Sequence, residues 1–249
     1  MKKSKTVRPE TLAIHAGIED PPQHGPVSVP IYQSATFSFR EADEGAARGG
    51  GGDRVQTRAE ISKLHQRLET TFIYVTHDQT EAMTMGSRIC VLRDGIMMQI
   101  DTPQNLYDKP DNVFVGGFIG SPAMNLFEVE LSSAGDAVSL QAGDFTLELP
   151  HEKAKHFQDY TERKVIVGIR PEDFKRAAEH SPGQTIPATV EVVEPIGNET
   201  YVNVTSGNVM LTAAVGRRTK IEPHSTINLI PIFENMHLFD CRSEKSIIN

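Results

Sequence analysis

The sequence predicts an α/β unit followed by an all-β unit, and three observations lead to this fold class. A run of apolar and β-branched residues at 71–76 predicts a fully buried strand, and helix-like and strand-like segments alternate around it. From residue 124 onward, short strand-like runs recur between turn signals, which is typical of a small antiparallel barrel or sandwich. The 249 residues, 38% hydrophobic and 23% charged, are enough for one large or two small globular domains.

The composition argues against several function classes. The formal net charge of −8 and the pI of about 5.6 argue against nucleic-acid binding. No apolar stretch approaches the roughly 18 residues that a membrane span needs. The charged beginning, MKKSKTVRPETLAIHAG, lacks the apolar core of a secretory signal. Cys90 and Cys241 lie in apolar, strand-like contexts, so we expect buried, reduced thiols, which fit the cytosol.

Residues 1–48 form an arm without a clear helix or strand period. Four prolines between residues 21 and 30 interrupt any regular element, so we expect an irregular arm that cannot close a core by itself. Residues 49–53 are expected to be a flexible linker, because four consecutive glycines lose much backbone entropy when they are ordered.

The unit at 54–123 is expected to alternate helices and strands. A helix at 53–68 is predicted by an apolar stripe at i, i+3 and i+7, and the predicted buried strand at 71–76 follows it. Asp78 has the residue type and the place of a helix cap, with Glu81 at the capping-box spacing.

A hairpin and two short helical segments are expected to complete this unit. The apolar runs on either side of Asp94-Gly95 predict a tight hairpin turn. Thr102, followed by a proline, predicts the start of a helix. We expect a second short helix or an extended apolar segment at 111–119, and a domain boundary near 121–124.

The second unit, 124–249, is expected to be all β. Its strand-like runs lie at 126–131, 137–141, 145–149, 164–169, 188–193, 201–204, 209–215, 226–232 and 236–239.

The arm resembles a known enzyme family. Residues 11–48 read TLAIHAGIEDPPQHGPVSVPIYQSATFSFR and then EADEGAAR. This is similar to the amino-terminal arm of the pyridoxal-phosphate enzymes of cysteine and methionine metabolism, an arm that reaches across to a partner subunit. The chain lacks the Tyr-x-Arg motif that grips the phosphate in that family, and it lacks the Schiff-base lysine region. We therefore expect no pyridoxal phosphate on this chain.

The remaining residues, 54–249, resemble a second family. They contain VTHDQTEAM, GIRPEDF and MHLFD, in that order. This set is similar to the carboxyl-terminal part of the ATP-binding subunits of ABC importers for maltose, other oligosaccharides and glycerol phosphate. The resemblance implies a partial P-loop NTPase-type α/β domain at 54–123 and an OB-like regulatory barrel, known as TOBE, at 124–249. The resemblance changes at the glycine linker, which indicates a fusion, a misjoined reading or a deliberate joining.

In that family the histidine after the strand is the switch residue, and His77 matches it. The resemblance implies that His77 is catalytic: its imidazole hydrogen-bonds the γ-phosphate of ATP and helps to place the attacking water. The alternative for a single histidine is a capping or core role at a strand end, and the surrounding motif favours the phosphate role. Asp78 is expected to be a helix cap, and Gln79 a surface or subunit contact. The other histidines lack metal-ligand spacing, so we assign no metal site.

Several parts of the family's nucleotide site are absent from the sequence. It has no GxxxxGK[ST] loop, no glutamine loop, no LSGGQ signature and no Walker B acidic pair. In the family these parts hold ATP and Mg, since backbone N–H groups and a lysine neutralise the phosphates. We therefore expect no ATPase activity and weak or absent ATP affinity from this chain.

The resemblance implies a truncated ATP-binding subunit of an ABC importer for sugars or related solutes. It would pair with membrane-spanning permease subunits, lie in the cytoplasm at the inner face of the membrane, and form a homodimer through its carboxyl-terminal domain. Because strands of the parent domain are missing, we expect exposed apolar faces in the α/β unit and a more stable barrel.

Two alternatives remain open at this point. One is a non-enzymatic TOBE module that dimerises or binds a small ligand, in which Arg170, Glu172 and Asp173 would be interface or loop residues. The other is a fragment of a pyridoxal-phosphate enzyme of cysteine and methionine metabolism.

Overall fold

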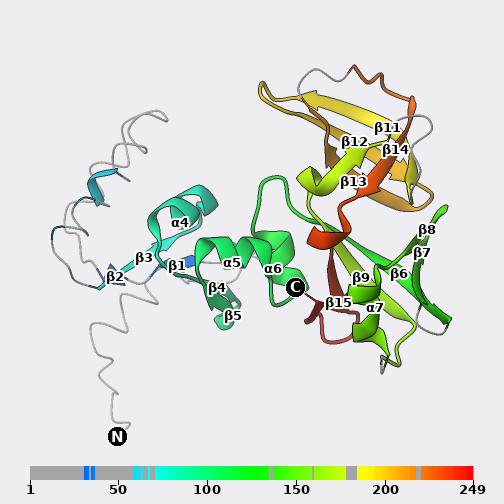
Figure 1. Cartoon of the computed structure of the whole chain (residues 1–249). Coiled ribbons are helices and arrows are strands. Elements are labelled where there is room, and N and C mark those ends of the chain that lie inside the picture. Colours follow the sequence, from blue (N-terminus) through cyan, green and yellow to red (C-terminus); the bar gives the residue numbers. More distant parts are fainter. Residues whose placement is uncertain are drawn as a thin grey trace, which may run out of the picture.

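The structure, a computed structural model, describes most of the chain from residue 71 onward. The described ranges are 71–134, 137–158, 160–177, 184–216 and 220–248, together with strand positions at 31–33 and 35–36 and helical positions at 59–61, 63 and 67. Those last positions fall inside the helix predicted at 53–68, and its other residues lie outside the described part. Figure 1 shows the α/β unit on the left and the all-β unit on the right.

The α/β unit contains a five-stranded sheet with the order β2-β3-β1-β4-β5. Its strands are β1 (Ile31–Gln33), β2 (Ala35–Thr36), β3 (Phe72–Thr76), β4 (Ile89–Arg93) and β5 (Ile96–Asp101). β1 pairs antiparallel with both β3 and β4, so a strand from the arm joins the two. The arm that we expected to be irregular thus contributes two short strands, and the rest of it lies outside the described residues. The predicted turn joins β4 to β5, with Asp94 and Gly95 at positive φ.

Three short helices pack on this sheet: α4 (Gln79–Met85), α5 (Pro103–Asp108) and α6 (Val113–Phe118). Each begins at a capping side chain, and the caps predicted at Asp78 and Thr102 are confirmed. Among the described residues, the core of this unit consists of Ala82, Ile89, Val91, Leu106, Val115 and Ile119. No helix in the described part of the chain is long and apolar enough to span a membrane.

The prediction that the strand at 71–76 is fully buried is wrong. In β3 the side chains of Ile73 and Val75 are 46% and 53% exposed, and Thr76 is buried. Successive side chains of a strand point to opposite faces, and in the described structure the face that carries Ile73 and Val75 is left open to solvent. A continuous apolar run predicts that a strand forms. It does not predict whether another segment covers each face of that strand.

The all-β unit consists of two antiparallel sheets. The first has the order β10-β14-β11-β12-β13, and the second has the order β16-β15-β9-β6-β7-β8. The first contains β10 (Phe174–Arg176), β11 (Ile186–Pro195), β12 (Thr200–Ser206), β13 (Val209–Ala214) and β14 (Thr226–Pro231). The second contains β6 (Asn125–Ala134), β7 (Ala137–Ala142), β8 (Phe145–Glu148), β9 (Lys164–Ile169), β15 (His237–Asp240) and β16 (Ser246–Ile248).

A hydrophobic core lies between these sheets, and the described part of the chain is mostly β-sheet with an OB-like fold. Burial alternates along the strands, as in β12, so each strand gives one face to the core. Every strand run predicted between residues 126 and 239 is a strand in the structure. Three elements have no counterpart among the predicted ones: β10, β16 and the helix α7 (His151–Ala154), which leads into a 3-10 turn that buries Phe157.

Candidate functional site

The candidate site is the connection between β3 and α4, which carries His77. Its side chain is exposed, directly after buried Thr76 at the end of β3 and directly before the cap residue Asp78. The neighbouring strand β1 pairs with this end of β3, where Ile31 lies opposite Thr76.

A network of hydrogen bonds fixes the backbone on both sides of His77. The hydroxyl groups of Thr76 and Tyr74 donate to the same Glu81 carboxylate oxygen, at 2.7 and 3.1 Å. The Asp78 amide donates to the Thr76 hydroxyl oxygen at 3.0 Å, and the Asp78 carboxylate accepts from the amides of Thr80 and Glu81. The exposed imidazole is therefore presented from a backbone that is held by the strand before it and the helix after it.

Gln79, which we expected to be a surface or subunit contact, makes two hydrogen bonds within the chain. It is half-buried, its amide nitrogen donates to the Phe118 carbonyl at 2.5 Å, and its amide oxygen accepts from Gly120 N–H at 3.2 Å. Both bonds lie within the chain and connect the start of α4 to the end of α6. Such a contact joins residues 39 and 41 positions apart, which local sequence patterns do not reveal.

The GIRPEDF motif forms the junction between the two units. Arg170 is only 2% exposed, and its guanidinium donates to the Ile119 carbonyl at 2.8 Å and, through Nε, to the Tyr107 carbonyl at 3.2 Å. It also lies over the Tyr107 ring, 3.5 Å from the ring centre. Glu172 accepts a hydrogen bond from the Tyr107 hydroxyl. Two residues of the barrel thus hold α5 and the end of α6.

Burial is the main cause of the shifted pKa values at this junction. It lowers the pKa of the Arg170 guanidinium from its usual value, against the opposing influence of neighbouring acidic groups. Burial, helped by the hydrogen bond to Glu172, raises the pKa of Tyr107. Burial also raises the pKa of the Asp173 carboxyl, although the Asn235 amide donates to it at 2.5 Å. Arg170 and Glu172 therefore serve an interface inside the chain, whereas the Asp173 side chain bonds within the barrel.

The two cysteines are half-buried, where the sequence predicted burial. Both are free thiols, and desolvation raises the pKa of each. Within the part of the chain that the structure describes, no cluster of three or more His, Cys, Asp or Glu side chains is placed to hold a metal ion.

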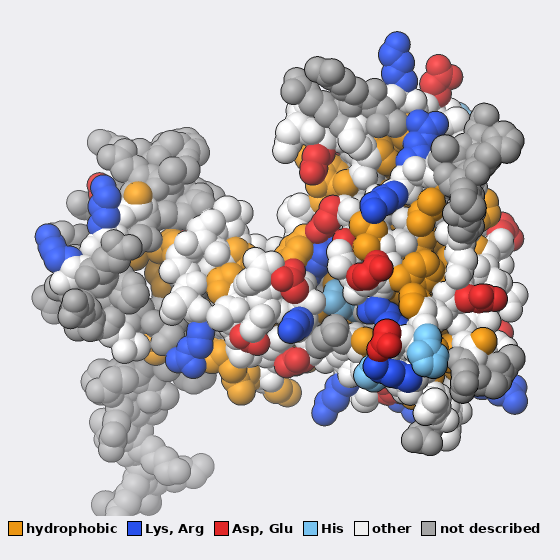
Figure 2. All heavy atoms as spheres, viewed as in Figure 1, with side chains coloured by type: hydrophobic (Ala, Val, Ile, Leu, Met, Phe, Trp, Pro, Cys, Tyr) orange, Lys and Arg blue, Asp and Glu red, His pale blue; other side chains and the backbone are white. Residues whose placement is uncertain are grey.

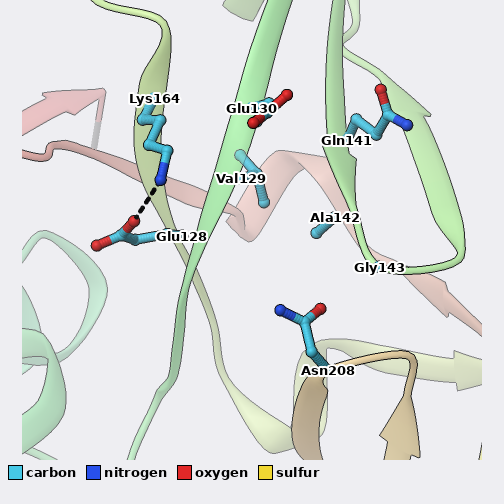
Figure 3. Close-up of a pocket in the computed structure, with 8 residues that line it drawn as sticks. All are labelled: Glu128, Val129, Glu130, Gln141, Ala142, Gly143, Lys164 and Asn208. Atoms are coloured by element: carbon cyan, nitrogen blue, oxygen red, sulfur yellow. Dashed lines mark hydrogen bonds and ion pairs between the residues drawn. The ribbon is translucent and has the colours of Figure 1, made fainter.

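The barrel carries a polar hollow of about 310 Å³, which the sequence analysis did not find (Figure 3). It is lined by Glu128, Val129, Glu130, Gln141, Ala142, Gly143, Lys164 and Asn208. Lys164 Nζ lies 3.3 Å from a Glu128 carboxylate oxygen, and both side chains are more than half exposed. The hollow is open and polar, belongs to the barrel strands and the β7–β8 and β12–β13 turns, and does not include His77.

The comparisons with known proteins agree with this architecture. Residues 120–174 match the family model for the MalK OB fold domain. The match spans the end of the α/β unit, strands β6 to β9 and the whole of GIRPEDF, which ends at residue 174.

Relatives match a longer part of the chain. It is 44% identical over 199 residues to the osmoprotective compounds uptake ATP-binding protein GgtA of Synechocystis, and 42% identical over 199 residues to the oligosaccharides import ATP-binding protein MsmX of Bacillus subtilis. It is 41% identical over 194 residues to the sulfoquinovosyl glycerol transport ATP-binding protein SmoE of Agrobacterium fabrum. Each match covers 78% of this chain and 53% of the relative.

The chain therefore spans about half the length of the curated relatives that it matches. The resemblance of residues 11–48 to pyridoxal-phosphate enzymes stays a prediction, as does the role of His77. The resemblance expected from VTHDQTEAM and GIRPEDF is confirmed: the chain is related to the ATP-binding subunits of ABC transporters for sugars and oligosaccharides, and it carries their MalK-type OB fold domain.

Proposed function

We propose that the chain acts as the carboxyl-terminal part of an ABC importer's ATP-binding subunit for sugars or related solutes. In this proposal β3, α4, β4 and β5 are the end of a P-loop NTPase-type domain, and the barrel is its regulatory domain. One observation carries the proposal: the exposed His77 follows β3 on a backbone that Thr76, Asp78 and Glu81 hold in place. A histidine fixed in this way can hydrogen-bond a phosphate oxygen, and phosphoryl transfer depends mainly on such positioning.

The described residues do not by themselves fit a complete Mg-ATP site. The described residues contain no cluster of three or more His, Cys, Asp or Glu side chains that could hold a metal ion, and the sequence lacks the glycine-rich loop whose lysine neutralises the phosphates. His77 alone leaves most of the triphosphate charge uncompensated. We therefore propose that this chain does not hydrolyse ATP by itself and that its affinity for Mg-ATP is very weak.

The same proposal gives the chain its partners and its place in the cell. Membrane-spanning permease subunits would be its partners at the cytoplasmic face of the membrane. A second copy would pair with it through the barrel. The names of the relatives support this, since they are ATP-binding proteins of uptake, import and transport systems. Sedimentation of the purified chain tests the pairing: a dimer is expected, and a monomer at all concentrations would contradict it.

A chimera tests the proposed function directly. The amino-terminal half of MsmX would be joined to residues 54–249 of this chain, and ATP hydrolysis would be measured. We expect turnover, and we expect His77→Ala to reduce kcat by about 100-fold or more, the typical cost of losing one group that stabilises transition-state charge. His156→Ala, an exposed histidine of the barrel, is the matched control. A folded chimera without turnover, or one in which both substitutions act alike, would contradict the proposal.

A second candidate function rests on the barrel alone. Its extensive core and its polar hollow are what a ligand-binding or dimerisation module needs. Two results together would favour this function over the first. The chain would bind a small polar solute saturably, with Lys164→Met weakening the binding, and the MsmX chimera would show no ATP turnover.

A further inference from the structure

The end of α6 is held from two sides. Phe118 and Gly120 are bonded by the Gln79 side chain, which belongs to the α/β unit. The carbonyl of the residue between them, Ile119, accepts a 2.8 Å hydrogen bond from Arg170, which belongs to the barrel. The Ile119 carbonyl and the Gly120 amide belong to one peptide group, so this group is held by Arg170 at its oxygen and by Gln79 at its nitrogen.

We propose that Arg170 is a positioning residue for His77, which acts from the barrel through residues 118–120 and Gln79. Gln79 opens α4 and lies two residues after His77, so a shift of the α6 end moves the start of α4 and the turn that carries the histidine. This inference rests on the proposed function for its meaning, although the mechanical link itself does not depend on it.

The surroundings of Arg170 leave this link little freedom. The guanidinium is buried, lies over the Tyr107 ring and donates to two backbone carbonyls from different elements. A planar fork with several donors can serve these acceptors together, whereas a lysine is a single point charge. Gly120 has a φ of +122°, and a Cβ there would lie 2.8 Å from Arg170 Nη1. The backbone of the α6 end is thus fitted closely to the guanidinium.

Gln79 is suited to the opposite end of the link. Its amide both donates and accepts, so it holds residues 118 and 120 in one relative orientation. The Asp78 amide, which donates to the Thr76 hydroxyl, and the Glu81 bonds to Tyr74 and Thr76 then tie α4 back to β3. His77 therefore lies in a short turn that is attached to β3 through Thr76 and to the end of α6 through Gln79.

Residue-resolved hydrogen exchange on Arg170→Lys, read at amides that the link should protect, tests the proposal in the chain as it exists. The amide of Gly120 donates to Gln79, and the amides of Thr80 and Glu81 donate to Asp78. We expect exchange at these three amides to accelerate by about tenfold, since coupled neighbours interact on that scale. The amides of Val202 and Leu211, inside the barrel sheet, should keep their rates. Arg176→Lys, an exposed arginine on β10, is the matched control.

The reverse experiment begins at the other end. Gln79→Ala should accelerate exchange of the Asp173 amide, which donates to the Arg170 carbonyl at 3.0 Å, while Gln158→Ala, an exposed glutamine of the barrel, should not. Unchanged rates at Thr80 and Glu81 in Arg170→Lys would overturn the proposal. Equal acceleration at Val202 and Leu211 would also overturn it, because it would mean a general loss of stability.

In the MsmX chimera, Arg170→Lys should lower kcat and leave KM for ATP unchanged, because the substitution moves His77 and touches no nucleotide contact. A loss confined to KM would count against positioning. If the chimera with Arg170 shows no turnover, the proposed function fails, while the exchange experiments still decide whether the link exists.

Discussion

The two units differ in how completely they cover their own apolar side chains. In the barrel, two sheets enclose a continuous core that includes Leu140, Val167 and Leu229. Among the described residues of the α/β unit, three short helices cover a core of six buried residues, and five large hydrophobic side chains are exposed: Ile73, Val75, Ile96, Met97 and Ile100. Figure 2 shows hydrophobic side chains at the surface around the β4–β5 hairpin.

This difference agrees with the expectation of exposed apolar faces in the α/β unit. The barrel closes its core with its own strands, whereas the first sheet includes a strand from the arm between β3 and β4. The Arg170 junction attaches the α/β unit, whose apolar side chains are less well covered, to the barrel, whose core is enclosed.

The largest effect is expected from a cavity in the barrel core. Leu229→Ala should lower the barrel's free energy of unfolding by about 2–5 kcal/mol, because the leucine is fully buried. Leu106 is equally buried in the α/β unit. Leu106→Ala should leave the barrel's unfolding transition unchanged and should broaden or remove the transition of the α/β unit, which we expect at lower denaturant concentration. Chemical denaturation followed by circular dichroism measures both. A shift of one common transition by both substitutions would show that the units unfold together.

A smaller effect is expected at Asn125, which joins the two sheets of the barrel. Its amide nitrogen donates to the carbonyls of Ile169 and Thr212, and its amide oxygen accepts from Thr212 N–H. Asn125→Ala should cost about 1–3 kcal/mol, since it leaves these backbone groups of β9 and β13 without partners. The same denaturation experiment measures the loss. Asn198→Ala, at an exposed turn, should change stability little, and equal losses in the two variants would contradict the account.

The exposed apolar residues of the first sheet should affect association more than stability. Ile73→Thr combined with Met97→Lys should reduce aggregation, because both side chains are about half exposed on strands of the incomplete unit. The free energy of unfolding should stay within about 0.5 kcal/mol, as for most surface substitutions. Light scattering against concentration measures the effect. Ile196→Thr in the barrel is the control, and an equal reduction there would remove the contrast between the units.

The smallest effect is expected from the pH dependence of Asp240. Hydrogen bonds from the Ser243 hydroxyl and amide and from the Tyr160 hydroxyl hold the pKa of this carboxyl at about 2. Because the pKa in the folded state is lower than the unfolded value of 3.8, the stabilisation is present above pH 3.8 and is lost as the pH falls towards 2.

Thermal unfolding between these pH values, compared with Asp240→Asn, measures this dependence. The substitution should flatten the curve over that interval. An unchanged slope would mean that other carboxyls account for the acid sensitivity.

Sequence reasoning succeeded where local chemistry decides the structure. Asp78 and Thr102 cap helices because their side chains reach amides two or three residues away, and Asp94-Gly95 turns because both residues accept positive φ. It failed where distant segments decide. Ile73 is exposed because no described segment covers its face of the sheet. Arg170 is buried because it packs against the end of α6, where it donates to the Ile119 carbonyl, 51 residues away in the sequence.

The candidate site, too, could be predicted where local patterns decide and could not be predicted where distant contacts decide. The place of His77 after a strand and before a capped helix could be predicted, since motif and local pattern coincide there. The roles of Gln79 and Arg170 could not, because each depends on the fold of α6 between them.

Titration of Mg-ATP into the purified chain, with His77→Ala as the control, tests the central claim most directly. The claim is that the chain retains the setting of the switch histidine and lacks the rest of a nucleotide site. We predict no saturable heat from either protein at millimolar ATP. Micromolar binding that His77→Ala weakens would contradict the account, because it would show that the chain forms a phosphate site without the glycine-rich loop.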